Sequence, residues 1–247
     1  MTARLAAYAR WQLVDYLLQR GILPLALVLL AAGAPRLALS HDAAILWSSP
    51  EGLAQSRMLF VQAVALFLPL GAFLATAHVL SGDRDRGYVR FYFSKPLSAT
   101  RFYLQQYLVH GAAFVALFGL ATVIWGAVTT HQSVHRAMEA AALTWLLVGG
   151  LGFFLGAALK PDGAVLAVVY LLASLTQGYV TVMRGAAVVW MRGIAAVTPP
   201  VLELDALRTS LYAGGPLDAH ALAHVAGYGA LTWVLGVVAL QRLPLQR

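Results

Sequence analysis

The sequence predicts an all-α integral membrane protein with six transmembrane helices, because of its composition and its hydropathy pattern. Of its 247 residues, 60% are hydrophobic and only 11% are charged, whereas soluble domains carry about 25% charged residues. Six apolar runs also have roughly the 20 residues that a helix needs to cross a bilayer. This composition excludes a soluble globular enzyme, a disordered chain and a nucleic-acid binder.

The six runs are continuously apolar, which favours helices over the alternating strands of a closed barrel. None of them holds a charged side chain except the first, where Arg36 lies near one end. We expect one transmembrane domain over 1–247, with spans one to five and their loops in 21–183 and the last span and a tail in 221–247. The predicted spans are 21–39, 58–80, 109–128, 140–159, 164–183 and 221–240.

The N-terminal residues 1–20 are expected to form a helix of their own. Trp11, Val14, Leu17 and Leu18 make an apolar stripe between flanking arginines. This pattern fits an amphipathic helix lying in the cytoplasmic interface, with Trp11 at headgroup depth. It fits equally a cytoplasmic extension of the first span.

The most charged stretch, 81–107, lies between the second and third spans and holds five cations, two acids and seven aromatic residues. It is too long for a tight turn, and Gly87 and Pro96 punctuate it. Ser98 or Thr100 is placed to cap a helix that runs on into the third span. By composition alone, the stretch is an ordinary positively charged loop that holds the topology.

The connection 184–220 precedes the last span and combines two short helical patterns. Its apolar part, 186–197, is too short to cross a bilayer and contains Arg192. Pro199-Pro200 stops that helix, and 202–212 then places its leucines on one face. We therefore expect an extracytoplasmic re-entrant hairpin rather than a seventh span.

The Lys and Arg residues are distributed unequally across the predicted membrane. With a cytoplasmic N-terminus, 11 of the 17 fall on the inside and six on the outside. The positive-inside rule then places both termini in the cytoplasm of a multi-pass protein. We expect this membrane to be the inner membrane of a bacterium.

The charged stretch also carries a more specific pattern. Asp83 and Asp85 stand four and two residues before Gly87, and Pro96 follows after an apolar segment. This arrangement between the second and third spans resembles the type-2 ABC transporter permease family. The six spans, the N-terminal helix and the short helices before the last span agree with that resemblance.

The resemblance implies that this stretch carries a cytoplasmic coupling helix, which docks on a separate ATPase subunit. The residues assigned to coupling are Asp83, Asp85, Gly87, Arg90, Phe91, Pro96 and Arg101. The chain contains no Gly-rich phosphate loop of the Walker type. We therefore predict a transport subunit that is not itself an enzyme, has no catalytic residues and binds no cofactor, with ATP and Mg in the partner.

The same resemblance implies the remaining partners. Two ABC ATPase subunits would drive an export path, and six spans make only half of such a path. A second permease, either an identical copy or a paralogue, would complete it within the lipid bilayer. No nucleic acid is expected as a partner.

Three glycines of the fourth span, Gly149, Gly152 and Gly156, are spaced for close helix packing. In the fifth span, Thr176, Gln177 and Thr181 either line a substrate path or form hydrogen bonds between helices.

Histidines recur at helical spacing on the predicted outer side. His131, His135 and Glu139 form one group, and His220 and His224 form another. Such spacing suits metal ligands, but solvated loop histidines are the simpler interpretation, and we assign no metal site.

His78 and His110 lie near the cytoplasmic ends of the second and third spans. Paired histidines on facing helices can ligate a haem. The alternative function is therefore a non-transport membrane anchor or a haem-binding subunit, which an absorbance spectrum would reveal.

Overall fold

The computed structural model describes residues 2–22, 26, 49–76, 83, 98–128, 132–159, 162–183 and 189–242. These residues are almost entirely helical, and no strand occurs among them, as the all-α class predicts. The helical segments are α1 Thr2–Tyr16, η1 Leu17–Gly21, α4 Pro50–Thr76, α7 Ala99–Val128, α8 Val134–Thr144, η2 Trp145–Gly149, α9 Gly150–Ala158, α10 Asp162–Met183, α11 Val189–Val197, α12 Val201–Ala213 and α13 Ala219–Arg242.

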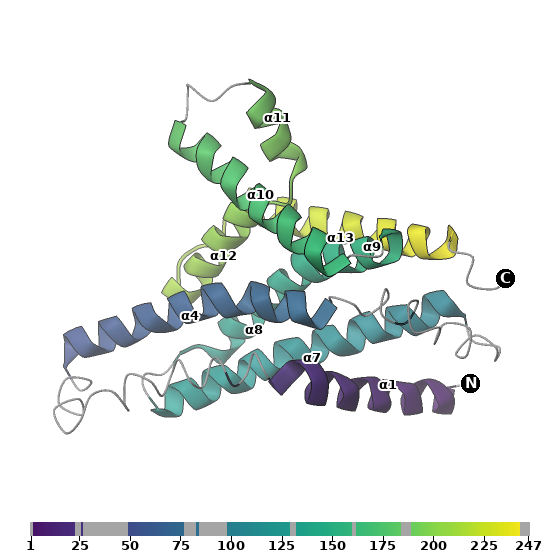
Figure 1. Cartoon of the computed structure of the whole chain (residues 1–247). Helices are drawn as coiled ribbons and strands as arrows, with labels where there is room; N and C mark the ends of the chain where they lie inside the picture. Colours follow the sequence, from purple (N-terminus) through teal and green to yellow (C-terminus); the bar gives the residue numbers. More distant parts are fainter. Residues whose placement is uncertain are drawn as a thin grey trace.

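Most of the long helices lie side by side in one bundle, and α10 and α11 project from it (Figure 1). Within the described ranges, five helices are long and apolar enough to cross a membrane. They are Met58–Thr76, Thr100–Ala127, Val134–Ala158, Gly163–Met183 and Ala219–Arg242. These correspond to the second to sixth predicted spans, and most of the first, 21–39, lies outside the described residues. The protein is thus a multi-pass helical membrane protein.

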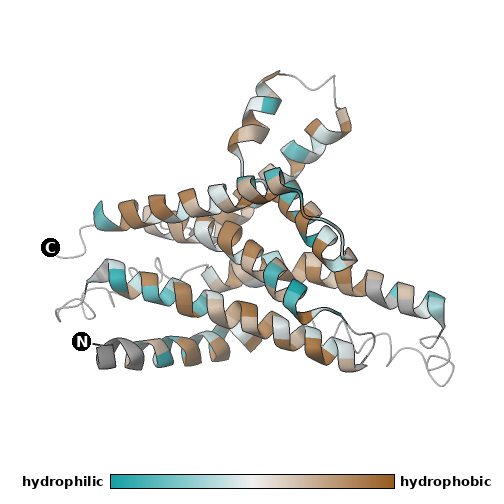
Figure 2. Ribbon diagram, turned by 180° about the vertical axis from the view of Figure 1, so that it is seen from behind, coloured by the Kyte–Doolittle hydropathy of each residue, from teal (hydrophilic) through white to brown (hydrophobic). Residues whose placement is uncertain are grey.

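Apolar residues cover the outward faces of the long helices as well as their inward faces (Figure 2). This distribution is expected where lipid, rather than water, surrounds the bundle.

The helix of the third span, α7, begins earlier than the hydropathy pattern predicts. It starts at Ala99 and runs for 30 residues, which corresponds to about 45 Å of helix. The hydrocarbon core is only about 30 Å thick. The Ser98 carbonyl accepts a hydrogen bond from the Phe102 amide at 3.0 Å. The helix therefore starts where the cap was predicted, and it includes the polar residues that precede position 109.

The N-terminal helix α1 runs beside α7 in the same direction (Figure 1). Three of the four residues in the predicted apolar stripe, Trp11, Val14 and Leu18, are exposed, whereas Leu17 packs against the largest buried cluster. Gln12 and Tyr16 are buried instead. A polar face turned inward and an apolar face turned outward suit a helix in lipid. The direction that α1 shares with α7 favours the second alternative, in which α1 extends the first span, over a helix that lies flat in the membrane interface.

The fourth span is one continuous helix with a π-helical turn in its middle. It begins with α8, whose N-cap Ser133 accepts a hydrogen bond from the Arg136 amide. It then passes through η2 into α9 with helical backbone angles throughout. A π turn inserts one extra residue into the repeat, so it changes which side chains face each neighbouring helix.

Two helices, α9 and α13, pack backbone to backbone. A Cβ added at Gly150 would lie 2.6 Å from the Gly229 carbonyl oxygen, and one at Gly229 would lie 2.5 Å from the Leu146 carbonyl oxygen. A Cβ at Gly236 would meet the Phe153 ring at 2.6 Å. Because no side chain larger than hydrogen fits at these positions, glycine permits the contact.

The connection before the last span forms the two short helices that the sequence predicts. They are α11 and α12, and Pro199-Pro200 separates them. The leucines expected on one face of α12, namely Leu204, Leu207 and Leu211, are all buried. By contrast, α11 buries none of its residues.

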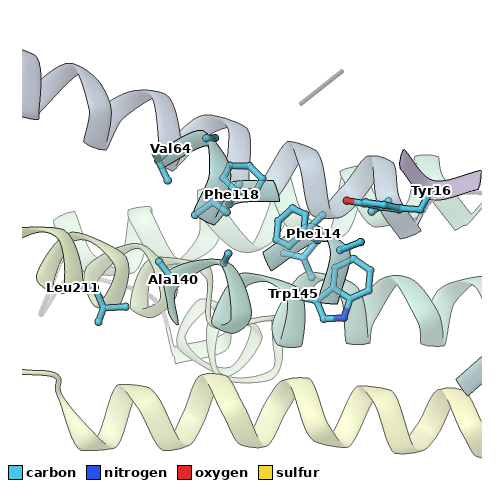
Figure 3. Close-up of a cluster of buried hydrophobic side chains, with 14 of the residues drawn as sticks. Tyr16, Val64, Phe114, Phe118, Ala140, Trp145 and Leu211 are labelled. Atoms are coloured by element: carbon cyan, nitrogen blue, oxygen red, sulfur yellow. The ribbon is translucent and has the colours of Figure 1, made fainter. Parts of the chain in front are cut away.

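The largest buried cluster lies where α4, α7, α8 and η2 meet. Aromatic rings dominate its centre, where Phe114 lies beside Trp145 and Tyr16 borders them from the N-terminal helix (Figure 3). The ring centroids of Phe114 and Trp145 are 5.6 Å apart. This packing holds the fourth span against the N-terminal half of α7, where the polar residues lie.

Candidate functional site

The structure describes the two ends of the predicted coupling segment. Five of its seven assigned residues lie outside the described residues, and Asp83 and Arg101 lie within them. The Tyr103 hydroxyl donates a hydrogen bond to Asp83 Oδ2 at 3.4 Å. The beginning and the end of the segment therefore meet beside the first turn of α7. The undescribed residues are Asp85, Gly87, Arg90, Phe91 and Pro96.

The start of α7 joins an exposed cation to a buried aromatic anchor. The Arg101 side chain is exposed, while Phe102 and Tyr103 are buried. The Phe102 ring also contacts the Tyr8 ring of α1, with centroids 5.9 Å apart. A charge at position 101 is thus available to a partner while the neighbouring side chains fix the helix.

A cavity of about 30 Å³ lies inside the bundle between α4, α7, η2 and α9. Its polar lining comes from Thr76, Tyr103, Gln106, Tyr107 and His110. Four of these belong to α7 at spacings of three or four residues, which places them on one face of that helix. The lining of the cavity is mainly apolar, and these polar groups gather on its α7 side.

The π turn η2 forms one wall of this cavity. The Tyr107 hydroxyl donates a hydrogen bond to the Trp145 carbonyl oxygen at 3.5 Å. The Trp145 indole lies over Gly111, where an added Cβ would come within 2.3 Å of its Nε1. Such π turns occur frequently at functional sites. Nothing in the composition of WLLVG predicted it.

The two helices α1 and α7 contact each other in a constant register. The Tyr16 and His110 rings lie 5.0 Å apart, and the same sequence offset that relates them also relates Tyr8 to Phe102. Midway between these contacts, that offset pairs Gln12 with Gln106.

This polar pair was not predicted. Gln12 is fully buried, and in the described part of the chain neither its Oε1 nor its Nε2 has a hydrogen-bond partner. The Oε1 atom of Gln106 is likewise buried without a partner there. Buried amides of this kind require a donor or acceptor nearby, and a rotation of the two side chains toward each other would supply one.

The glycines singled out by their spacing have different surroundings. A Cβ at Gly152 would lie 2.5 Å from Thr76 Oγ1, so this glycine brings α9 close to α4. Gly149 lies under the Trp145 and Tyr107 rings, and Gly156 lines the cavity. The close backbone approach between the fourth span and α13 uses Gly150 and Gly229 instead, and the spacing argument missed it because the partner helix was unknown.

A second polar region surrounds α12 and holds a buried cation that the sequence did not single out. Arg208 is 2% exposed and forms an ion pair with Asp205, one turn earlier. Among the described residues, its Nε and Nη1 atoms have no hydrogen-bond partner. Burial lowers the pKa of the Arg208 guanidinium, and the nearby Tyr170 and Tyr212 raise it. Burial also raises the pKa of Tyr212, and Arg208 opposes that shift.

The C-terminal end of α12 is fixed by a glycine and an arginine. Gly214 adopts the left-handed conformation with a φ of 76°, and the Gly215 amide donates to the Ser210 carbonyl at 2.9 Å. The Arg136 side chain donates from Nη1 to the Leu211 carbonyl at 3.1 Å. These bonds satisfy the last carbonyls of the helix and tie it to α8.

Gln177 connects α10 to the turn between α11 and α12. Its Nε2 donates to the Pro199 carbonyl at 2.6 Å and to the Thr198 hydroxyl at 3.3 Å. Its Oε1 accepts from the Leu202 amide at 3.1 Å. Of the two roles open for the polar residues of the fifth span, Gln177 takes the one of bonding between segments.

Two of the histidines singled out by their spacing contact a carboxylate. His135 lies 3.0 Å from Glu139, and His224 lies 2.9 Å from Glu203 of α12. The rings of His220 and His224 pack edge to face at 6.4 Å. His131 lies outside the described residues, and within them no group of three or more His, Asp or Glu residues gathers as a metal site would require.

The histidine pair considered for haem is described at one position only, because His78 lies outside the described residues. The cavity beside His110 measures about 30 Å³, whereas pockets for cofactor-sized molecules measure roughly 300 Å³ or more. Tyr16 and the α7 helix itself occupy the space around the imidazole.

No protein-family model and no curated protein matches this chain.

Proposed function

We propose that this chain is the permease subunit of an ATP-binding cassette exporter. It forms half of a transmembrane path that separate ATPase subunits drive, and a second permease completes the path. Three properties support the proposal: several helices apolar enough to cross a membrane, the resemblance of the segment 83–101, and a sequence without a phosphate-binding loop.

The observation that carries the proposal is the contact between the two ends of the coupling segment. Because the Tyr103 hydroxyl bonds to Asp83, a displacement of the segment acts on α7 and on the chain that follows α4 together. The exposed Arg101 offers a charged contact at the same place. A docking element that moves two spans at once is what a transporter needs to change the side of access.

The geometry of α7 suits the transmission of such a displacement. One unbroken helix of 30 residues runs from this segment through the bundle. Its buried aromatic side chains pack against α1 and the fourth span. A stiff, well-packed helix moves as a unit rather than bending, so motion at its start reaches the opposite side.

The chain also has a defined orientation in the membrane under this proposal. Both termini lie in the cytoplasm of a bacterium, as the distribution of Lys and Arg indicates. The helices α11 and α12 form a re-entrant hairpin on the outer side, and the second permease or lipid covers the exposed apolar face of α10.

The test is purification of the chain together with the ATPase encoded beside its gene, followed by ATP hydrolysis measurements in nanodiscs. We expect the ATPase to copurify, and we expect Arg101→Glu to lower the permease-stimulated hydrolysis about tenfold, as removal of an interface anchor does. The matched control is Arg192→Glu, an exposed arginine on α11, which should leave hydrolysis within about twofold.

The proposal fails if no ATPase copurifies and if Arg90→Glu, Pro96→Ala and Arg101→Glu all leave hydrolysis unchanged. A Soret band in the absorbance spectrum of the purified chain would instead support the haem-binding alternative.

A further inference from the structure

A groove of about 340 Å³ lies on the outer surface of the bundle between α9 and α13, which run side by side (Figure 1). Its lining is apolar except for one arginine. The lining residues are Phe154, Ala157 and Ala158 of α9 and Leu235, Val238, Ala239 and Arg242 of α13. This lining suits an occupant that is apolar along most of its length and charged at one end.

Glycine contacts hold the two sides of this groove together. A Cβ added at Gly236 would lie 2.6 Å from the Phe153 ring and 3.1 Å from the Phe154 Cα atom. Gly150 and Gly229 bring the same two helices together farther from the C-terminal end of each. Because α9 and α13 are in contact at two levels, the groove keeps its shape without an occupant.

Arg242 lies at the border of the membrane. It is exposed and stands in the last turn of α13, a helix of 24 residues. Such a helix is about 36 Å long, whereas the hydrocarbon core is only about 30 Å thick. Figure 2 shows that α13 changes from hydrophobic to hydrophilic at this end. The arginine is therefore placed at the depth of the lipid headgroups.

The arginine is also aligned with the groove. The four lining residues of α13 occupy positions i, i+3, i+4 and i+7, which share one face of a helix. From Leu235 to Arg242 this face rises about 10 Å toward the membrane border. In the sequence a second cation, Lys160, directly follows Leu159, the residue that caps the neighbouring end of α9.

We propose that this groove is a binding site for an anionic phospholipid, with one acyl chain in the groove and the phosphate beside Arg242. Apolar contact alone does not select a lipid, because the tails of the surrounding bilayer are equally apolar. The cation supplies the selection, since it attracts an anionic headgroup more strongly than a zwitterionic one. Basic pockets between transmembrane helices hold anionic headgroups in this way.

The experiment uses the full chain alone in nanodiscs, so its outcome does not depend on any ATPase. The sequence contains no cysteine, so Val234→Cys gives a single attachment point for a fluorophore. Val234 is exposed beside the groove and does not line it. The discs contain phosphatidylcholine and an increasing fraction of a lipid with brominated tails, which quench a nearby fluorophore. We expect brominated phosphatidylglycerol to reach half-maximal quenching at about a fivefold lower fraction than brominated phosphatidylcholine.

Two matched pairs of variants in the labelled chain separate the charge from the groove. Arg242→Gln removes the cation and should abolish the preference for phosphatidylglycerol, whereas Arg192→Gln, on the exposed α11, should keep it within about twofold. Ala158→Trp fills the groove without changing the charge and should also abolish the preference. Ala230→Trp, at an exposed position of α13 outside the groove, should keep it.

The proposal is overturned if the two brominated lipids quench the labelled chain equally. It is also overturned if neither lipid quenches, because protein rather than lipid would then cover the groove. A third contrary result is that Arg242→Gln loses stability but keeps the lipid preference, as expected if this arginine interacts only with the dipole of its own helix. Equal preferences in Ala158→Trp and Ala230→Trp would likewise exclude the groove as the site.

Discussion

The spans Val134–Ala158 and Gly163–Met183 follow each other in the chain and have nearly equal mean hydropathy, 1.8 and 1.7. Inside the protein they differ completely, since 72% of the apolar stretch of the first is buried and only 11% of the second. Hydropathy reports that a helix suits lipid, but it does not report whether protein or lipid surrounds that helix. The difference arises from small residues and from polar contacts.

The physical reason is the weak hydrophobic attraction between helices in a membrane. Lipid tails are as apolar as leucine, so helices associate through close packing and hydrogen bonds. The buried span has glycines that meet neighbouring backbones, as at Gly150. In the exposed span, a Cβ added at Gly178 would meet nothing within 4 Å.

The largest effect is expected from placing a leucine at Gly150. Its side chain would enter the space of the Gly229 carbonyl, 2.6 Å from the Cβ position, so α9 and α13 would have to separate. We expect a loss of about 3 kcal/mol or more in unfolding free energy, seen as a lower yield of folded protein and an earlier unfolding midpoint in detergent.

The matched control for this change is Gly178→Leu in the exposed span, which should shift the unfolding free energy by less than about 0.5 kcal/mol. Equal destabilisation by both variants would show that protein encloses the two spans equally, which would contradict the difference in burial between them.

A smaller difference is expected when one leucine is shortened in each span. Leu147 is 1% exposed and Leu172 is 51% exposed. Leu147→Ala leaves a cavity in the protein and should cost about 2–3 kcal/mol, whereas lipid fills the space left by Leu172→Ala, which should cost under about 0.5 kcal/mol. Chemical unfolding of both variants in the same detergent measures the difference, and a costly Leu172→Ala would reveal a protein neighbour on that face.

Gln177 is the point at which the exposed span is fastened to the rest. Gln177→Leu removes its bonds to Pro199, Thr198 and Leu202, and we expect a loss of about 2 kcal/mol. Hydrogen exchange at the Leu202 amide should become faster.

The control is Thr181→Val on the same helix, because the Thr181 hydroxyl bonds only within α10 among the described residues, to the Gln177 carbonyl at 2.8 Å. Unchanged exchange at Leu202 in Gln177→Leu would mean that α12 is held without α10.

The smallest effect concerns the pair His224 and Glu203, which joins α13 to α12 at the edge of the buried region. Both side chains are about one-third exposed, so solvent screens their attraction, and Glu203→Gln should cost less than about 1 kcal/mol. Thermal unfolding of this variant beside Glu139→Gln, which removes the partner of His135, measures it. A cost of several kcal/mol for Glu203→Gln would mean that water reaches this ion pair less readily than the exposed fractions of its two side chains imply.

Sequence patterns predicted much of this fold, and particular residues show which features those patterns do not predict. Pro199-Pro200 and the leucines of α12 predicted a helix break and a buried face, because both depend on local geometry alone. The Ser98 cap predicted the start of the α7 helix, whereas hydropathy placed the third span only from 109, because Gln106 and Tyr107 lower the local hydropathy although they line a cavity inside the bundle.

The remaining features depend on neighbours that a single sequence does not identify. The π turn at Trp145 is stabilised by packing over Gly111 and by the Tyr107 hydroxyl. Gly150 is critical only because Gly229 lies opposite to it. The cavity is formed by four separate segments, so the spacing on α7 alone gave no sign of it.

The contact of α1 with α7 has a consequence for biosynthesis. Gln12 is made early, but its register partner Gln106 follows only after the first two predicted spans and nearly all of the charged segment. At about 5–20 residues per second, the N-terminal helix waits on the order of 5–20 seconds for its neighbour. During this interval the amide of Gln12 must find other partners, in the insertion machinery or at the membrane surface. The first helix to be made thus reaches its final contacts only once α7 has been made, and variants that weaken α7 should be recognised by quality-control proteases through α1.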